Sequence, residues 1–128
     1  MKLPALSDIQ AAYERISPFI HQTPVLTSRQ LNVIFGCELF FKCENFQKVG
    51  AFKFRGATNA VLSLPAEKRK AGVVTHSSGN HAAALALAAS MNGIRPLIVM
   101  PLSAPSVKKE AVAGYGAEIT FCEPTLRA

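Results

Sequence analysis

The sequence predicts an α/β fold: an open, mostly parallel, doubly wound sheet with helices on both faces. From Glu38 onward, short apolar stretches alternate with segments of helical spacing, and short loops join them. Two of the predicted strands, 73–76 and 97–100, are nearly continuous apolar runs, which is typical of strands covered on both faces. Such alternation indicates parallel strands joined by right-handed helical crossovers.

The composition fits this fold class and excludes several functions. The chain has 128 residues, of which 49% are hydrophobic, so it is too apolar to be disordered. We find no apolar run of 18 residues and no secretory h-region, and therefore expect a cytoplasmic protein with no membrane partner. The net charge of +6 is scattered, which argues against nucleic acid and favours an anionic small ligand. The three cysteines fit no C-x-x-C pattern and are expected to be reduced, partly buried thiols.

The first 36 residues are predicted to be mainly helical. Ser7 and Gln10 have the spacing of a capping box, so a helix should open at Ser7 and end near Pro18. A short strand is predicted at 25–27. Ser28 can then cap a second helix with Leu31, Ile34 and Phe35 on one face, and Gly36 ends this helix.

The remaining elements alternate strictly. The predicted order is strand 38–43, helix 51–64, strand 73–76, helix 81–91, strand 97–100, helix 106–113 and strand 118–122. Ligands on parallel sheets bind beyond the carboxyl ends of the strands. The informative loops are therefore 44–50, 77–80 and 101–105, and we expect all of them at the same edge.

The loop of Ser77, Ser78, Gly79 and Asn80 leaves a strand and enters an alanine-rich helix. Free backbone N–H groups and the positive end of the helix dipole make such a loop a cradle for carboxylate or phosphate. An ordinary capped turn would use the same residue types, so the loop alone does not decide between the two. The flanking histidines are five residues apart across the turn, and we predict no metal site from them.

Lys53 is the second candidate group. Steps of three and four residues from Lys53 reach Ala57, Val61 and Leu64, an apolar stripe, so Lys53 is expected to head the buried face of its helix. Burial favours the neutral amine, which is a nucleophile for carbonyl groups and forms Schiff bases. Arg55 is expected to point outward or to pair locally, and we assign it no catalytic role.

These motifs resemble those of the serine/threonine dehydratase and serine racemase family, pyridoxal-phosphate enzymes of the tryptophan-synthase-β fold type. The resemblance rests on segments 50–57 (GAFKFRGA) and 77–81 (SSGNH), with 23–26 (TPVL), 45–47 (NFQ) and 114–117 (GYGA) in support. It covers essentially the whole chain. Within this family, the residues of the two motifs most resemble the branch of microbial serine racemases and threo-3-hydroxyaspartate dehydratases. Many threonine dehydratases instead have Ser in place of Ala51 and Ala in place of Ser78.

The resemblance implies a role for each site residue. Lys53 would bind pyridoxal 5'-phosphate covalently and then act as the base at the substrate α-carbon. Phe52 would pack against the pyridine ring, and Asn80 would hydrogen-bond its 3-hydroxyl group. The substrate carboxylate would be held by Ser77, Ser78, Gly79, Asn80 and His81. The implied reaction is dehydration and deamination of serine, threonine or 3-hydroxyaspartate, or racemisation, for which Ser78 would be the acid/base on the other face.

The resemblance also implies how much of such an enzyme is present. Residues 1–36 would be a leader of the large domain, and residues 37–128 would be the small domain. The family's phosphate-binding loop, the partner of the pyridine nitrogen and the acidic ligands of a divalent cation would all follow residue 128. We therefore expect an N-terminal fragment that is inactive alone, and a homodimer at full length. Leader residues Ile9, Tyr13, Ile16, Leu31 and Ile34 would then form an exposed apolar patch.

Three alternatives remain open. The chain could be a non-catalytic α/β remnant, or one piece of a split enzyme that needs a second polypeptide. A sister activity on the same fold, cysteine or threonine synthesis, is the third. The cysteine synthases would be expected to show Lys-Asp-Arg where Lys53 is followed by Phe and Arg.

Overall fold

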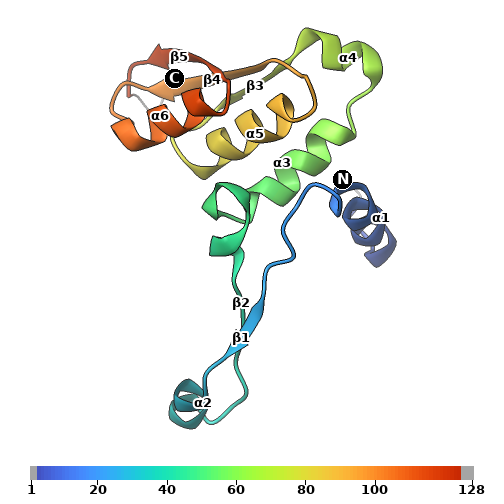
Figure 1. Cartoon of the computed structure of the whole chain (residues 1–128), viewed down its shortest axis with the longest axis vertical. Helices are drawn as coiled ribbons and strands as arrows, with labels where there is room; N and C mark the ends of the chain where they lie inside the picture. Colours follow the sequence, from blue (N-terminus) through green and yellow to red (C-terminus); the bar gives the residue numbers. More distant parts are fainter. Residues whose placement is uncertain (1–2, 125–128) are drawn as a thin grey trace.

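The computed structural model describes residues 3–124 (Figure 1). Its main sheet has parallel strands in the order β3-β4-β5. The strands are β3 (Val73–His76), β4 (Pro96–Pro101) and β5 (Glu118–Cys122), and the crossover helices are α5 (Asn80–Ser90) and α6 (Ser106–Gly114). The predicted alternation over this part of the chain, and the α/β class, are confirmed.

The core lies between the sheet, α5 and α3 (Lys53–Leu62). Along β4 burial alternates: Ile98 and Met100 are fully buried and join the alanines of α5, whereas Leu97 and Val99 point to the opposite face and are half-buried. Helix α5 is buried nearly all round because α3 covers the side that the sheet does not (Figure 1). Alanine at most of its positions allows this close packing on both sides.

The predicted strand 38–43 does not join the main sheet, which corrects the expectation of a fourth parallel strand. Only Phe40–Lys42 is extended (β2), and it pairs antiparallel with β1 (Val25–Thr27) in a separate ribbon. Helix α2 (Arg29–Phe35) connects β1 to β2 along the chain and reverses the chain direction. An apolar run fits a ribbon strand as well as a buried parallel strand, so the pattern alone could not separate them.

Helix α2 forms as predicted. The Ser28 Oγ accepts a hydrogen bond from the Leu31 N–H (3.3 Å), and Gly36 ends the helix with φ +63°, in the left-handed region. The β1–β2 ribbon joins residues on both sides of the predicted domain boundary at residue 36.

The first helix ends near Pro18 as predicted, but it does not begin with the predicted capping box. Helix α1 is Leu6–Ile16, so Ser7 lies inside it, and the Asp8 carboxylate accepts from the Ala5 N–H (2.8 Å) in place of the Ser7–Gln10 box. The helix ends at Ile16, just before Pro18, which lacks the N–H needed to continue it. Of the expected apolar patch, Ile16 is buried in the core and Leu31 is half-buried, while the other members are exposed.

Several short elements were not predicted. They are α4 (Ala66–Ala71), which begins directly after Pro65, and two 3-10 turns, η1 (Glu44–Phe46) and η2 (Lys48–Gly50). Within residues 3–124, no helix is both long and apolar enough to cross a membrane. The thiols of Cys43 and Cys122 are half-buried as expected, but Cys37 is exposed.

Candidate active site

The loop after β3 leads from the sheet edge into the start of α5. The Ser77 N–H donates to the Val99 carbonyl (3.0 Å), which extends the β3–β4 pairing by one residue, and the Ser77 Oγ accepts from the Gly79 N–H (3.3 Å). Gly79 is the N-cap residue of α5, and no side chain caps the first turn in the described structure. The first-turn N–H groups and the positive end of the helix dipole are thus available at this edge.

Lys53 stands at the start of α3 and is exposed, so the prediction that it heads a buried face is wrong. The stripe holds at Ala57 and Val61, which are buried, but at the first turn the inward position belongs to Phe54. Phe52 is also exposed (59%), and its ring lies under the Lys53 Nζ at 5.0 Å. Lys53 and Phe52 are thus exposed at the start of α3, although the next residue, Phe54, is fully buried, so the periodicity identified the buried face at Ala57 and Val61 but not the exposure of Lys53.

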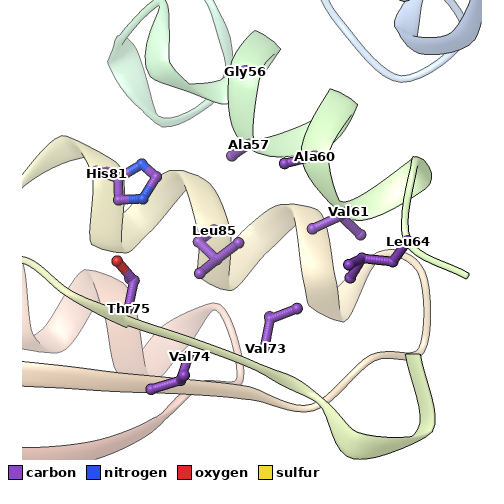
Figure 2. Close-up of a pocket in the computed structure, with 10 residues that line it drawn as sticks. All are labelled: Gly56, Ala57, Ala60, Val61, Leu64, Val73, Val74, Thr75, His81 and Leu85. Carbon is purple, nitrogen blue, oxygen red and sulfur yellow. The ribbon is translucent and has the colours of Figure 1, made fainter. Parts of the chain in front are cut away.

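Helices α3 and α5 lie side by side and run in the same direction (Figures 1 and 2). Lys53 and Asn80, their first residues, are therefore at the same end of the helix pair. Figure 2 shows the apolar groove between the two helices and β3, with a volume of about 290 Å³; Gly56 and His81 line one end and Leu64 the other. The structure thus brings together the two motifs that the sequence singled out.

The residues of the segment 77–81 differ in their exposure. Ser77 and Gly79 are half-buried, whereas Ser78, Asn80 and His81 are exposed. The Asn80 Oδ1 accepts a hydrogen bond from the Lys108 Nζ of α6 (3.2 Å). With its oxygen occupied, the Asn80 amide presents its N–H groups as donors. Lys108 was not predicted, because no local spacing connects two residues on successive helices.

Of the three loops expected at one edge, 77–80 and 101–105 follow adjacent sheet strands. The Leu102 N–H donates to the Cys122 carbonyl (2.9 Å), which ties the second of these loops to β5. The loop 44–50 follows the ribbon strand β2, not a sheet strand, yet its turn η2 packs against α5. This loop therefore reaches α5 from the β1–β2 ribbon and not, as predicted, from a strand of the main sheet.

Arg55 makes the strongest polar contacts near the site. Its Nε donates to the Glu44 Oε2 and its Nη2 to the Glu44 Oε1, both at 2.8 Å. The hydrogen bonds from Arg55, opposed in part by desolvation and reinforced by Thr23, lower the pKa of Glu44 from 4.5 to about 2. Arg55 was expected to point outward or to pair locally, and it does neither: it is half-buried, and its partner Glu44 lies on another element, 11 positions away in sequence.

The residues at this end fit pyridoxal phosphate by their chemistry. An exposed lysine amine can condense with an aldehyde, an aromatic ring lies beside it, and an amide donor stands at the neighbouring helix start. The open first turn of α5 suits an anionic group. Among residues 3–124 there is no group of three His, Cys, Asp or Glu side chains able to hold a metal ion.

Comparisons with known proteins agree with this chemistry. Residues 16–128 match the model of the family described as pyridoxal-phosphate dependent enzyme. A serine racemase of Arabidopsis thaliana is 60% identical over 118 residues, which are 92% of this chain and 36% of the relative. A beta-hydroxyaspartate dehydratase of Paracoccus denitrificans is 54% identical over 125 residues, 98% of this chain and 40% of the relative.

Solved structures extend the agreement to the fold. The structure of maize serine racemase superposes with a TM-score of 0.95 at 47% identity, over 99% of this chain and 39% of that one. The chain thus spans less than half the length of the proteins that it matches. The structural neighbours are pyridoxal-phosphate enzymes of fold type II. On the match of residues 16–128 and on this identity, the chain belongs to the family of pyridoxal-phosphate dependent enzymes.

Proposed function

We propose that this chain carries the reactive lysine and the carboxylate-binding loop of a pyridoxal-phosphate enzyme that dehydrates and deaminates small hydroxy amino acids. The substrate class is serine, threonine or 3-hydroxyaspartate. The observation that carries the proposal is that Lys53 and Asn80 are the first residues of two packed helices that run in the same direction. Relatives named serine racemase, beta-hydroxyaspartate dehydratase and L-threo-3-hydroxyaspartate ammonia-lyase support the substrate class.

Each residue has a task in this proposal. The Lys53 amine would hold the cofactor, and it would act as the base that accepts the proton from the substrate α-carbon. The N–H groups and hydroxyls of Ser77–Asn80, with His81, hold the substrate carboxylate at the helix start. The Asn80 amide would donate to the 3-oxygen of the cofactor, and Phe52 would pack against its ring. Bound pyridoxal phosphate supplies the electron sink for the α-carbanion.

Ser78 supports racemisation as a second activity. Its side chain is exposed in the loop at the start of α5. In this proposal its hydroxyl would deliver a proton to the face of the α-carbon opposite Lys53. In the complete gene product, Ser78→Ala should remove racemisation and leave dehydration. Equal loss of both reactions would instead assign Ser78 to carboxylate binding alone.

The proposal also covers the location, the oligomeric state and the domains of the enzyme. We place it in the cytoplasm as a homodimer acting on free amino acids, with residues 1–36 belonging to a large domain and residues 37–128 forming the small one. Sedimentation of the complete gene product tests the dimer.

Trapping with borohydride tests the central assignment. The chain is incubated with pyridoxal phosphate, reduced, and mapped by mass spectrometry for the modified lysine. Lys53 should be modified well above Lys68 and Lys70, and Lys53→Ala should remove that modification while Lys48→Ala retains it. Labelling of Lys53 no greater than that of the surface lysines would contradict the proposal and favour a non-catalytic α/β protein.

A further inference from the structure

Arg55 follows Lys53 by two residues, on the first turn of α3. Its guanidinium group points back toward the N-terminal segment and not into water. Besides the two 2.8 Å bonds to the Glu44 carboxylate, its Nη2 donates to the Thr23 Oγ1 (3.3 Å) and to the His21 carbonyl (3.4 Å). The side chains of Arg55 and Glu44 are only 25% and 20% exposed, so water screens this pair weakly.

Further hydrogen bonds hold the same segments together. The Thr23 Oγ1, on a buried residue, donates to the Glu44 Oε1 (2.6 Å). Gln47 is 2% exposed; its side chain accepts from the His21 N–H (2.9 Å) and donates to the His21 carbonyl (2.8 Å). We call Thr23, Glu44, Gln47 and Arg55 the Arg55 clasp. The clasp ties residues 21–23, residues 44–47 and the first turn of α3 into one unit.

The clasp closes a strained turn. Val49 has φ +58° and Gly50 has φ +67°, and a β-branched residue in the left-handed region is rare. Such strain costs on the order of 1–3 kcal/mol and persists only where the surrounding structure holds it. Glu44 and Gln47 hold the chain before the turn and Arg55 holds it after, so the segment 44–55 is fixed at both ends with Phe52 and Lys53 inside it.

Phe52 and Lys53 have little else to fix them. Both side chains are exposed, and no side chain within residues 3–124 caps the N-terminus of α3. Their positions relative to the Ser77–Asn80 loop therefore depend on the backbone between the Val49 turn and Arg55. This backbone is held in two ways: the fully buried Phe54 packs it against the core, and the clasp bonds it to residues 21–23 and 44–47.

We propose that Arg55 is a positioning residue: through Glu44 and Thr23 it holds the strained turn and thereby sets where Lys53 stands at the site. The proposal rests on the proposed function, since it concerns the lysine that would bind the cofactor. Arg55 itself touches no reacting atom. A lysine at this position would keep the charge but lose the two-pronged contact with the carboxylate.

The test compares Arg55→Gln with Arg95→Gln. Arg95 forms the other ion pair of the described chain, with Glu118, but the side chains of that pair are 73% and 56% exposed. Far-UV circular dichroism first establishes that the variants are folded, and Glu44→Gln, which breaks the same clasp from its other side, serves as the second variant. The first readout is the rate at which pyridoxal phosphate is trapped on Lys53. The second is amide hydrogen exchange over residues 45–54, which requires no cofactor.

We expect Arg55→Gln and Glu44→Gln to slow trapping on Lys53 by about tenfold or more, the scale of misplacing a reacting group. Exchange over residues 45–54 should rise while that of β3–β5 stays unchanged, Arg55→Lys should be intermediate, and Arg95→Gln should match the wild type. Faster exchange with unchanged trapping would overturn the inference and leave the clasp a structural contact. Absence of selective trapping in the wild type would overturn the proposed function, and the inference with it.

Discussion

Large apolar side chains are buried in one region of the molecule, which we call the body, and exposed in another, which we call the arm. The body is α3, α5, α6 and the β3–β5 sheet, and its large apolar side chains Phe54, Ile98 and Met100 are fully buried. The arm is residues 25–42, that is β1, α2 and β2, which extend away from the sheet (Figure 1). The arm's large apolar side chains Ile34 and Phe40 are mostly exposed.

The difference follows from what covers each sheet. The body strands have crossover helices packed on them, and α5 has both the sheet and α3 around it. The arm is a ribbon of two strands with one short helix, and a ribbon of this size has marginal stability in water. The sequence therefore indicates which residues would be stabilised by burial, but the topology decides which of them are buried within the described chain.

The largest contrast should come from removing one phenylalanine in each region. Phe54→Ala empties a fully buried position in the body and should lower the free energy of unfolding by about 3–5 kcal/mol. Phe40→Ala removes a ring that is 67% exposed in the arm and should change it by less than about 1 kcal/mol. Urea unfolding followed by circular dichroism measures both. Equal losses would show that the arm belongs to the same cooperative core.

The junction between arm and body should respond to acid. The pKa of Glu44 is lowered in the folded chain to about 2 from 4.5, mainly by the Arg55 hydrogen bonds. The stabilisation is therefore complete above pH 4.5 and is lost as the pH falls toward 2, with a size on the order of 2–3 kcal/mol. Glu44→Gln should remove this part of the pH dependence.

Glu118→Gln is the matched control for this titration, because the exposed pair of Glu118 with Arg95 contributes between zero and about 1 kcal/mol. Urea midpoints of the wild type and both variants at pH 5 and pH 2.5 provide the comparison. If Glu44→Gln were to lose as much stability between these pH values as the wild type does, the carboxylate would not be held by Arg55.

Glycines in the two regions should differ for a steric reason. Gly72, which directly precedes the body strand β3, has φ +87° and ψ −174°, a region that is essentially restricted to glycine, and an added Cβ would lie 2.7 Å from the Arg95 carbonyl oxygen. Gly36 in the arm has φ +63° and ψ 25°, and no atom of the described residues lies within 4 Å of its added Cβ. Gly72→Ala should therefore cost about 2 kcal/mol or more, and Gly36→Ala about 1 kcal/mol. Thermal unfolding of both variants tests the order, which a larger loss for Gly36→Ala would contradict.

The sequence predicted the body better than the arm because the body obeys local rules. Parallel strands between amphipathic helices leave a clear apolar rhythm, so the elements from Val73 to Cys122 were located to within a few residues. The pairing of β1 with β2 depends on where α2 returns the chain, which no periodicity records. For this reason the strand at 40–42 was predicted but assigned to the wrong sheet.

The candidate site shows the same limit. Its two motifs lie at the starts of α3 and α5, where the strand-to-helix order predicted them. The exposure of Lys53 was missed because spacing gives the face of a helix and not what lies above its first turn. The Arg55–Glu44 pair was missed because its partners are 11 positions apart on different elements, a spacing that belongs to no local motif.

The smallest effect on stability should come from the tip of the arm. Ile34→Ser in α2 replaces an apolar side chain that is exposed, so the free energy of unfolding should change by less than about 0.5 kcal/mol. Exposed apolar residues that lie together promote association, so the same substitution should reduce self-association at high concentration. Sedimentation velocity across a concentration series measures this, with Glu38→Ser, a polar arm residue, as the control. Unchanged association in Ile34→Ser would mean that this part of the arm does not drive contacts between copies, whereas a large loss of stability would mean that Ile34 is covered in solution.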